Sequence, residues 1–250
     1  MSDLSQPNMS AKSSQGDWLR SVARQYALHI ALLGLIILSA VLSPSFLSSG
    51  NLTNMLLQYA PLGIVVIGQV FVILVRGLDL SVASVMATAA VIATSFNGQN
   101  SDAIPIIGAV LAMGLCVGFV NGFLVTKRKV SPFLATLATM IVLQGLRSAY
   151  TQGAPSGNVP SFFRVLGSES LMGVPYNLIV TIVVATLFST LLAKSAFGRR
   201  VYITGGNPET ARLLGMKADR TIIICYMISG SLAALAGLIL SGFVGIVDNW

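Results

Sequence analysis

The chain has 250 residues, of which 54% are hydrophobic and only 9% are charged, and its mean hydropathy is +0.82. A soluble domain of this size needs far more polar surface, so the composition indicates an integral membrane protein. The formal net charge of +7 does not indicate nucleic-acid binding, because the basic residues lie in short gaps between apolar runs and form no basic face with interleaved aromatic residues.

The hydropathy pattern predicts one transmembrane domain after a polar tail. Residues 1–25 are polar and precede the first apolar run, so we expect an uncleaved N-terminal tail in the cytoplasm. Residues 26–250 predict an all-α, polytopic helix bundle. Crossing about 30 Å of hydrocarbon takes roughly 20 apolar residues. Seven runs qualify as crossings, at 26–43, 59–75, 81–96, 105–125, 131–149, 175–193 and 221–246.

The positions of the basic residues predict the orientation. With the tail inside, segments 1–25, 76–80, 126–130 and 194–220 are cytoplasmic, and they hold every Lys and Arg except Arg147 and Arg164. Cytoplasmic loops of membrane proteins are enriched in Lys and Arg. The N-terminus is therefore expected in the cytoplasm.

Asp79 is the one acidic residue flanked on both sides by long apolar runs. An ionised Asp near the bilayer centre costs about 2.5 to 3.5 kcal/mol, so we expect it to pair, with Arg76 as the nearest cation, or to face water. One interpretation is a tight cytoplasmic turn in which Asp79 caps the next helix through the N–H of Ser81 or Val82. The other is a helix break that lines a transport path.

Further polar side chains fall within the predicted crossings. They are Gln69, Asn121, Thr136, Thr139 and Gln144. Together with Asp79 and Ser81 they are the candidates for a substrate path, because side chains that both donate and accept suit an uncharged, hydroxyl-rich ligand. An interhelical hydrogen bond is the alternative for each.

Small residues recur at every fourth position in the fourth and seventh runs. They are Gly114, Gly118 and Gly122 in one run, and Gly237, Ser241 and Gly245 in the other. This spacing lets backbones approach closely, so we expect both helices in the middle of the bundle.

The longest segment on the far side is 151–174. Its Gly, Pro and Ser content predicts a loop, in which Phe162, Phe163, Val165 and Leu166 could form a short surface helix. Packing at the lipid interface and docking of an external partner are equally open for it.

Residues 197–220 form the only long polar, basic segment between two apolar runs. Asn207 is placed to cap a helix, Pro208 suits its first position, and Glu209 meets the positive end of the helix dipole. Gly215 is expected just past the helix end.

Such a helix, over 208–214, has about two turns and is marginal in water, so it must pack on something. Ala211, Leu213 and Leu214 offer an apolar patch, while Arg212 and Lys217 stay polar. The patch suits docking on a soluble partner, and a plain connector between membrane helices is equally open.

Three stretches carry a family pattern in the same order along the chain. The matching residues are Gly77, Leu78, Asp79, Leu80, Ser81, Val82, Ser84, Val85 and Met86, then Asn121, Gly122, Pro132, Phe133, Thr136, Leu137 and Thr139, then Phe197, Gly198, Arg199, Val201, Tyr202, Ile203, Gly205, Gly206, Asn207, Ala211, Arg212, Leu213 and Gly215. Together they resemble the sugar-importing ABC transporter permeases of the ribose, xylose and galactose type, within the branched-chain permease superfamily. Ser131 and Thr204 depart from the commoner Pro and Ala of that pattern.

The resemblance implies a permease subunit that forms the translocation path of an ATP-driven monosaccharide importer in a bacterial inner membrane. The partners it implies are a cytoplasmic ATP-binding subunit, a periplasmic or external sugar-binding protein, a second permease in a homo- or heterodimer, and the lipid bilayer. It also implies that the 194–220 loop holds the coupling helix that docks on the ATPase. The coupling residues are Gly205, Gly206, Asn207, Glu209, Ala211, Arg212, Leu213, Leu214 and Gly215.

The sequence contains no nucleotide-binding loop and no nucleophile, metal or redox constellation. We therefore predict no catalytic residue, metal site or cofactor, and ATP hydrolysis by a separate subunit. One alternative is an ion-gradient-driven secondary carrier, for which Asp79 is the single protonatable candidate. The other is a shortened, non-transporting permease remnant, because permeases of the resembled family continue with further helices beyond Trp250.

Overall fold

A computed structural model describes residues 15–96, 98–153 and 157–245. The chain divides into two units, at residues 1–52 and 53–250. The first holds helix α1 (Gln15–Leu42) and the beginning of α2 (Ser49–Leu74). Helix α1 begins inside the predicted 1–25 tail, whose residues 1–14 lie outside the described part of the chain.

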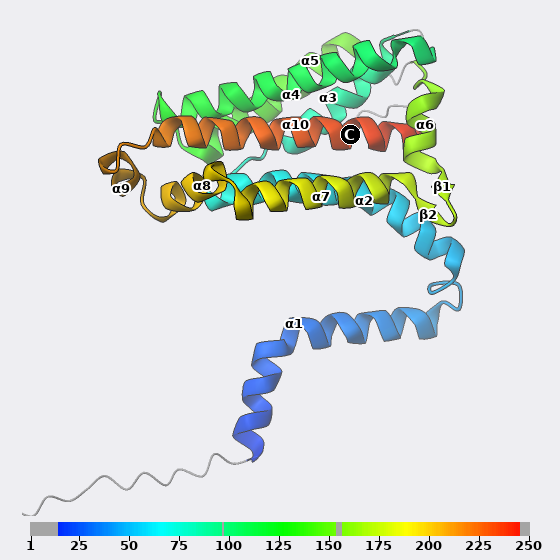
Figure 1. Ribbon diagram of the computed structural model, residues 1–250. Coiled ribbons are helices and arrows are strands. Elements are labelled where there is room, and N and C mark those ends of the chain that lie inside the picture. The colour runs from blue at the N-terminus through cyan, green and yellow to red at the C-terminus, as the bar shows by residue number, and fades with distance from the viewer. Residues whose placement is uncertain (1–14, 97, 154–156, 246–250) are drawn as a thin grey trace, which may run out of the picture. The chain divides into compact units, whose positions relative to one another are not determined.

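The second unit is almost entirely helical, which confirms the all-α prediction (Figure 1). After α2 it contains α3 (Val82–Thr94), the 3₁₀ helix η1 (Asn100–Asp102), α4 (Ala103–Thr126), α5 (Pro132–Thr151), α6 (Ser161–Ser168), α7 (Tyr176–Lys194), α8 (Ala196–Gly206), α9 (Pro208–Leu213) and α10 (Ala218–Val244). Strands β1 (Ser170–Leu171) and β2 (Val174–Pro175) pair antiparallel.

Six described helices are long and apolar enough to cross a membrane: α1, α2, α4, α5, α7 and α10. The third predicted crossing differs. Its helix α3 has 13 residues, or about 20 Å at 1.5 Å per residue, which is short of the roughly 30 Å of a bilayer core. The residues before α3 run without helical structure from residue 77 to residue 80. The predicted seven crossings thus become six full helices and one interrupted segment.

Helix α10 lies at the centre of the second unit, with α3, α4 and α5 on one side of it in Figure 1 and α2 and α7 on the other. It contacts α3, α4, α6 and α8, and it buries more of its side chains than any other described helix. Tyr226, Leu238 and Ile239 are among its fully buried residues. Most of the bundle is therefore organised on one helix.

The close approach of α4 and α10 depends on glycine, as predicted. A Cβ on Gly118 would lie 2.3 Å from the carbonyl oxygen of Tyr226, and one on Gly114 would lie 2.5 Å from that of Gly230. Farther along α10, a Cβ on Gly237 would lie 2.2 Å from the Met86 carbonyl oxygen of α3. The prediction was wrong for Gly245, which has φ +75° and forms the C-terminal cap of α10 instead of a helix contact.

A hydrogen bond joins α7 to α2 at a position where a proline interrupts the backbone hydrogen bonds of α2. Pro61 lies inside α2, and because proline has no N–H it leaves the carbonyl of Leu57 without its helical donor. The buried Asn177 of α7 donates its side-chain amide to this carbonyl at 2.6 Å. A backbone group that lipid could not satisfy is thereby paired inside the protein.

Helix α6 forms within the predicted 151–174 loop and closes one end of α10. Phe163 is fully buried, whereas Phe162 is exposed. A Cβ on Gly242 of α10 would lie 1.9 Å from the carbonyl oxygen of Phe163. The helix thus packs on protein through one face, and docking of an external partner on the other face stays a prediction.

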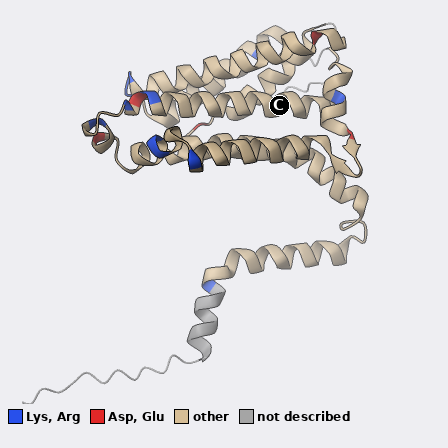
Figure 2. Ribbon diagram, viewed as in Figure 1, with Lys and Arg blue, Asp and Glu red and all other residues tan. Residues whose placement is uncertain are grey.

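The basic residues gather at the opposite end, where α8, α9 and the beginning of α10 lie (Figure 2). Lys127, just after α4, bonds to Asp219 in the first turn of α10 at 2.7 Å, and Arg76 donates to the Gly206 carbonyl of α8 at 2.6 Å. Segments 126–130 and 194–220 therefore lie together with Arg76, as predicted. Residues 77–80 of the predicted cytoplasmic segment 76–80 instead turn into the bundle, where Asp79 bonds to Ser229. We call this the basic end.

The glycine contact gives the first prediction. Gly-to-Ala changes inside helices are normally stabilising by about 1 kcal/mol, and we expect that for Gly108→Ala, because nothing lies within 4 Å of its Cβ position. Gly118→Ala on the same helix should instead destabilise by about 1 to 3 kcal/mol, because α10 must move away. Thermal unfolding of the detergent-solubilised protein measures both, and equal shifts would contradict the contact.

Candidate functional site

The interrupted crossing begins with a tight turn after α2. Arg76 has φ +61°, and the N–H of Gly77 bonds to the Val72 carbonyl at 2.8 Å, which is the hydrogen-bond pattern of a Schellman helix end. A Cβ on Gly77 would lie 2.6 Å from the hydroxyl of Tyr226. The chain therefore turns back into the bundle against α10. We call residues 75–81 the re-entrant segment.

The re-entrant segment carries Asp79 to membrane depth. The Asp79 side chain is almost fully buried and accepts a hydrogen bond from the hydroxyl of Ser229 at 2.9 Å. Ser229 lies about 16 Å along α10 from its first residue, at 1.5 Å per residue. This places the carboxylate near the middle of a bilayer core about 30 Å thick.

Three donors compensate the buried carboxylate. Besides Ser229, its other oxygen accepts from the Ser81 hydroxyl at 2.6 Å and from the Ser81 N–H at 3.0 Å. The predicted hydrogen bond from the Ser81 N–H is thus confirmed, but it lies in a buried site and not in a surface turn. The N-cap residue of α3 is Ser81, which has no side-chain cap. Hydrogen bonds to the charged form offset the desolvation cost that burial imposes on an Asp.

The hydrogen bonds continue from the re-entrant segment into α4 and α5. Asn121 of α4 donates to the Ser81 hydroxyl oxygen at 2.9 Å, and Thr139 of α5 donates to the Asn121 side-chain oxygen at 2.6 Å. Asn121 is fully buried. One chain of side chains, which we call the Asp79 network, therefore joins α4, α5, α10 and the re-entrant segment.

Two more candidates bond to the backbone of the re-entrant segment. The Gln69 amide donates to the Asp79 carbonyl at 2.8 Å. The buried Thr136 donates chiefly to the Pro132 carbonyl of its own helix at 2.8 Å, with the Leu78 carbonyl at 3.5 Å. Tyr226 donates to the Leu78 carbonyl at 3.2 Å. These bonds pair backbone carbonyls of the re-entrant segment, which have no helical hydrogen-bond partners.

The expected ion pair between Arg76 and Asp79 was wrong. The Arg76 guanidinium lies at the basic end and donates to the Gly206 carbonyl, whereas Asp79 lies inside the bundle. Pairing by sequence proximity failed because the chain turns sharply between the two residues. Ser229 and Tyr226, which bind this segment from α10, were missed by sequence reasoning because they are far along the chain. Ser229 is one of three serines in α10, so its residue type did not single it out.

Of the seven substrate-path candidates, Asp79, Ser81, Asn121 and Thr136 are buried and bond to protein atoms. Gln69 and Thr139 are partly buried, and Gln144 lies on an exposed face of α5. The structure thus brings six of the seven together and leaves Gln144 apart. The buried members bind the helices to one another, as the alternative interpretation had it.

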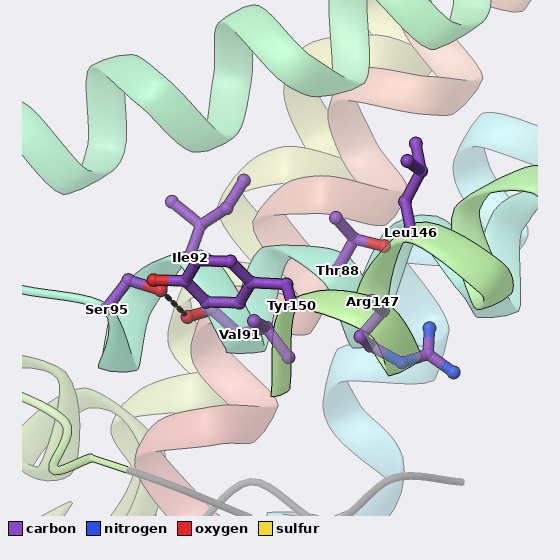
Figure 3. A pocket seen from close by; sticks show the side chains of 7 residues that line it. All are labelled: Thr88, Val91, Ile92, Ser95, Leu146, Arg147 and Tyr150. Atoms are coloured by element: carbon purple, nitrogen blue, oxygen red, sulfur yellow. Dashed lines mark hydrogen bonds between the residues drawn. The ribbon is translucent and has the colours of Figure 1, made fainter. Parts of the chain in front are cut away.

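A pocket of about 340 Å³ lies between α3 and α5, outside the Asp79 network (Figure 3). Two of its polar side chains already make hydrogen bonds to the backbone. Thr88 donates to the Ser84 carbonyl at 2.7 Å, and Ser95 donates to the Val91 carbonyl at 2.8 Å. The ring of Tyr150 lies across it in Figure 3. None of the sequence-predicted path residues lines this pocket.

Helix α9 forms where it was predicted, beginning at Pro208 and ending at Leu213, one residue before the predicted Leu214. The side-chain oxygen of Asn207 accepts from the N–H of Glu209 at 2.9 Å and of Thr210 at 3.3 Å. At the other end, Gly215 has φ +74°, and the N–H of Met216 bonds to the Ala211 carbonyl at 3.0 Å. These local interactions hold a helix of six residues.

The predicted docking patch is corrected at Ala211. This side chain is fully buried against its own chain, whereas Leu213 is 88% exposed and Leu214 is 66% exposed. Gly205 is also internal, because a Cβ there would lie 1.7 Å from the Leu74 carbonyl oxygen. Gly206 is exposed and accepts the bond from Arg76. The outward surface of α9 therefore consists of leucine side chains and charged side chains.

Arg212 connects α9 to α10. It bonds to Glu209 within α9 and to Asp219 at 2.9 Å, and the hydrogen bond that it donates to Asp219 is the main cause that raises the pKa of Arg212 above its ordinary value. Asp219 also accepts from Lys127. The short helix is thus attached to the end of α4 and the start of α10 by exposed ion pairs.

The Asp79 network gives the second prediction. Ser229→Ala removes the α10 donor and leaves one carboxylate oxygen of Asp79 unpaired inside the protein, which should destabilise by about 1 to 3 kcal/mol. Ser231→Ala is the matched control, because Ser231 donates only to the Met227 carbonyl of its own helix. Thermal unfolding in detergent should separate the two variants. Similar melting temperatures would show that Ser229 does not compensate Asp79.

Comparison with known proteins identifies a matching family and several similar permeases. Residues 51–249 match the family model described as branched-chain amino acid transport system / permease component. The ribose import permease protein RbsC of Bacillus subtilis is 38% identical over 83% of this chain and 65% of its own length. The autoinducer 2 import system permease protein LsrC of Escherichia coli O157:H7 is 31% identical over 90% and 66%, and the L-arabinose transport system permease protein AraH of Escherichia coli K12 is 33% identical over 87% and 66%.

The matches thus span about two thirds of the relatives' length. No solved structure matches the chain. The permease relatives and the six apolar helices make it a multi-pass membrane protein. With most of its length matched by the family model, the chain belongs to the branched-chain amino acid transport system / permease component family.

Proposed function

We propose that this chain is the membrane-spanning subunit of an ATP-driven importer of a monosaccharide, working in a bacterial inner membrane. Its partners are a separate ATPase at the basic end, which faces the cytoplasm, an external sugar-binding protein, and a second permease. The observation that carries the proposal is the geometry of α9. A capped helix outside the membrane-length segments exposes two leucines between charged residues.

Such a surface suits a soluble partner. Leu213 and Leu214 supply exposed apolar area, and Glu209 and Arg212 lie beside them as a polar rim, where charges guide association more than they tighten it. Ion pairs to α4 and α10 hold the helix in place. A partner docked on α9 would therefore act on α4 and α10, the two helices that pack closely through Gly114 and Gly118.

An uncharged substrate is consistent with the polar side chains near the re-entrant segment. Gln69 and Thr139 are partly exposed beside it, and both are neutral. A sugar needs donors and acceptors but no counter-charge. The relatives include a ribose import permease and an L-arabinose transport permease, so we infer a pentose or a closely similar monosaccharide.

A secondary carrier driven by an ion gradient fits the site less well. Such a mechanism needs a protonatable or ion-binding group that changes its state during transport. Asp79 already accepts three hydrogen bonds from protein donors. Losing its charge would weaken the hydrogen bonds that it accepts, so we assign Asp79 a structural role.

The docking surface gives the third prediction. Leu213→Glu places a charge in the apolar contact and should cost about 2 kcal/mol or more of ATPase binding, as loss of an interface anchor does. Membrane insertion should be unchanged, because the residue lies outside the crossings. Met172→Glu is the control, since Met172 is 98% exposed in the β1–β2 turn away from α9. Co-purification of the ATPase is the measurement, and full retention by the Leu213 variant would show that α9 is only a connector.

The energy source gives the fourth prediction. Uptake of radiolabelled ribose or arabinose by cells that express the chain with its partner subunits should fall on ATP depletion. It should persist when an uncoupler collapses the proton gradient while ATP is maintained. Uptake that the uncoupler abolishes and ATP depletion leaves unchanged would overturn the proposed importer in favour of a secondary carrier.

A further inference from the structure

A second pocket, of about 260 Å³, opens at the basic end between the end of α4 and the start of α10. Its charged lining residues are Lys127, Arg212, Lys217, Asp219 and Arg220. We call it the basic pocket. It is separate from the Asp79 network and from the pocket between α3 and α5.

The charges of the basic pocket do not balance internally. Its single carboxylate, Asp219, already bonds to Lys127 at 2.7 Å and to Arg212 at 2.9 Å. Lys217 and Arg220 add two further cations, and no ion pair engages either of them within the described part of the chain. Arg212 also pairs with Glu209 of α9, so four cations face two carboxylates and two positive charges remain in excess. Like charges repel one another, so an anion bound among them would be stabilised.

The position of the pocket relates it to the membrane surface. Lys127 follows the last residue of α4, and Arg220 lies in the first turn of α10. Both helices are long and apolar enough to cross a bilayer, so their ends lie where hydrocarbon gives way to headgroups. Basic pockets between membrane helices at the cytoplasmic side are suited to anionic lipid headgroups.

A partly exposed apolar strip runs away from the pocket along α4. Phe119 and Phe123 lie eight and four residues before Lys127, on the same helix face, with their rings stacked 6.1 Å apart. Arg128 holds its guanidinium 5.8 Å from the Phe123 ring centre. On α10, Ile224 is 42% exposed one turn below Arg220. A small anion in water would make no use of this strip, whereas lipid acyl chains would.

We propose that the basic pocket binds the phosphate headgroup of an anionic phospholipid. Lys217 and Arg220 contact the phosphate, and the acyl chains lie along Phe119, Phe123 and Ile224. Because Arg212 and Asp219 form the opposite wall, the bound lipid stabilises the arrangement of α9 on α4 and α10. The competing occupant is an acidic segment of a protein partner, but such a segment would not need an apolar strip at membrane depth.

The test uses the intact chain in detergent with added phosphatidylglycerol and phosphatidylcholine, and native mass spectrometry measures the lipid retained. Each cation near a headgroup contributes roughly fivefold to binding. Lys217→Gln with Arg220→Gln should therefore lower phosphatidylglycerol retention roughly tenfold or more. Arg199→Gln with Arg200→Gln makes the same charge change on exposed residues of α8 and should retain the lipid.

A charge-preserving swap, Lys217→Arg with Arg220→Lys, guards against a folding defect and should retain phosphatidylglycerol. Wild-type retention by the Gln variant, or equal loss in the α8 control, would overturn the proposal. Thermal unfolding separates the ligands: short-chain phosphatidylglycerol should raise the melting temperature and inorganic phosphate should not. An equal shift with phosphate alone would overturn the lipid assignment in favour of a small anion.

Co-purification of the ATPase distinguishes an acidic protein segment from a lipid as the occupant of the basic pocket. A wild-type chain that retains no phosphatidylglycerol, combined with loss of the co-purifying ATPase in the Gln variant, would overturn the lipid site in favour of a protein contact. Lipid retention is measured on the isolated chain, so it does not depend on the proposed transport function. A failure of one proposal leaves the other standing.

Discussion

A carboxylate at the middle depth of a membrane protein has to be surrounded by donors, and the arrangement around Asp79 follows from this constraint. The donors come from Ser81 beside it and from Ser229 on α10. Asn121 and Thr139 then extend the same bonds to α4 and α5. A buried polar group without partners is costly, so these helices hold their positions relative to the re-entrant segment.

Close packing is what allows so small a set of side chains to reach one another. Serine and asparagine are short, and they meet across helices only because Gly118 of α4 and Gly77 of the re-entrant segment lie against α10 without a Cβ between them. In lipid, where burial of apolar surface does not drive helix association, such contacts and hydrogen bonds supply the stability. The network and the glycine contact therefore depend on each other.

The two ends of the bundle differ in the interactions that hold their short helices. At one end, α6 packs on the last turns of α10. At the basic end, exposed ion pairs join α9 to α4 and α10, and exposed pairs of this kind contribute little to stability. Their geometry is better suited to positioning the leucine surface of α9 and the basic pocket beside it. Both of our binding proposals therefore fall on the same end, with a protein on one surface and a lipid on the other.

Features set by neighbouring residues were predictable from the sequence. The cap at Asn207, the positive φ of Gly215, the membrane-length helices and the glycine spacing of α4 depend on a few adjacent positions or on periodicity. The motif around Asp79 also indicated an unusual segment. By itself, then, the sequence determined the all-α membrane class and the approximate positions of the six membrane-length helices.

Only the tertiary structure decided which of these residues meet. Arg76 bonds to Gly206 and not to Asp79, Ala211 turns inward while Leu213 faces out, and Ser229 reaches Asp79 from 150 positions along the chain. Local propensity carries no information about such pairings, because they depend on how α10 lies against α4 and on how the chain turns after α2. Partners chosen by proximity in sequence fail wherever the backbone reverses, and the re-entrant segment is such a reversal.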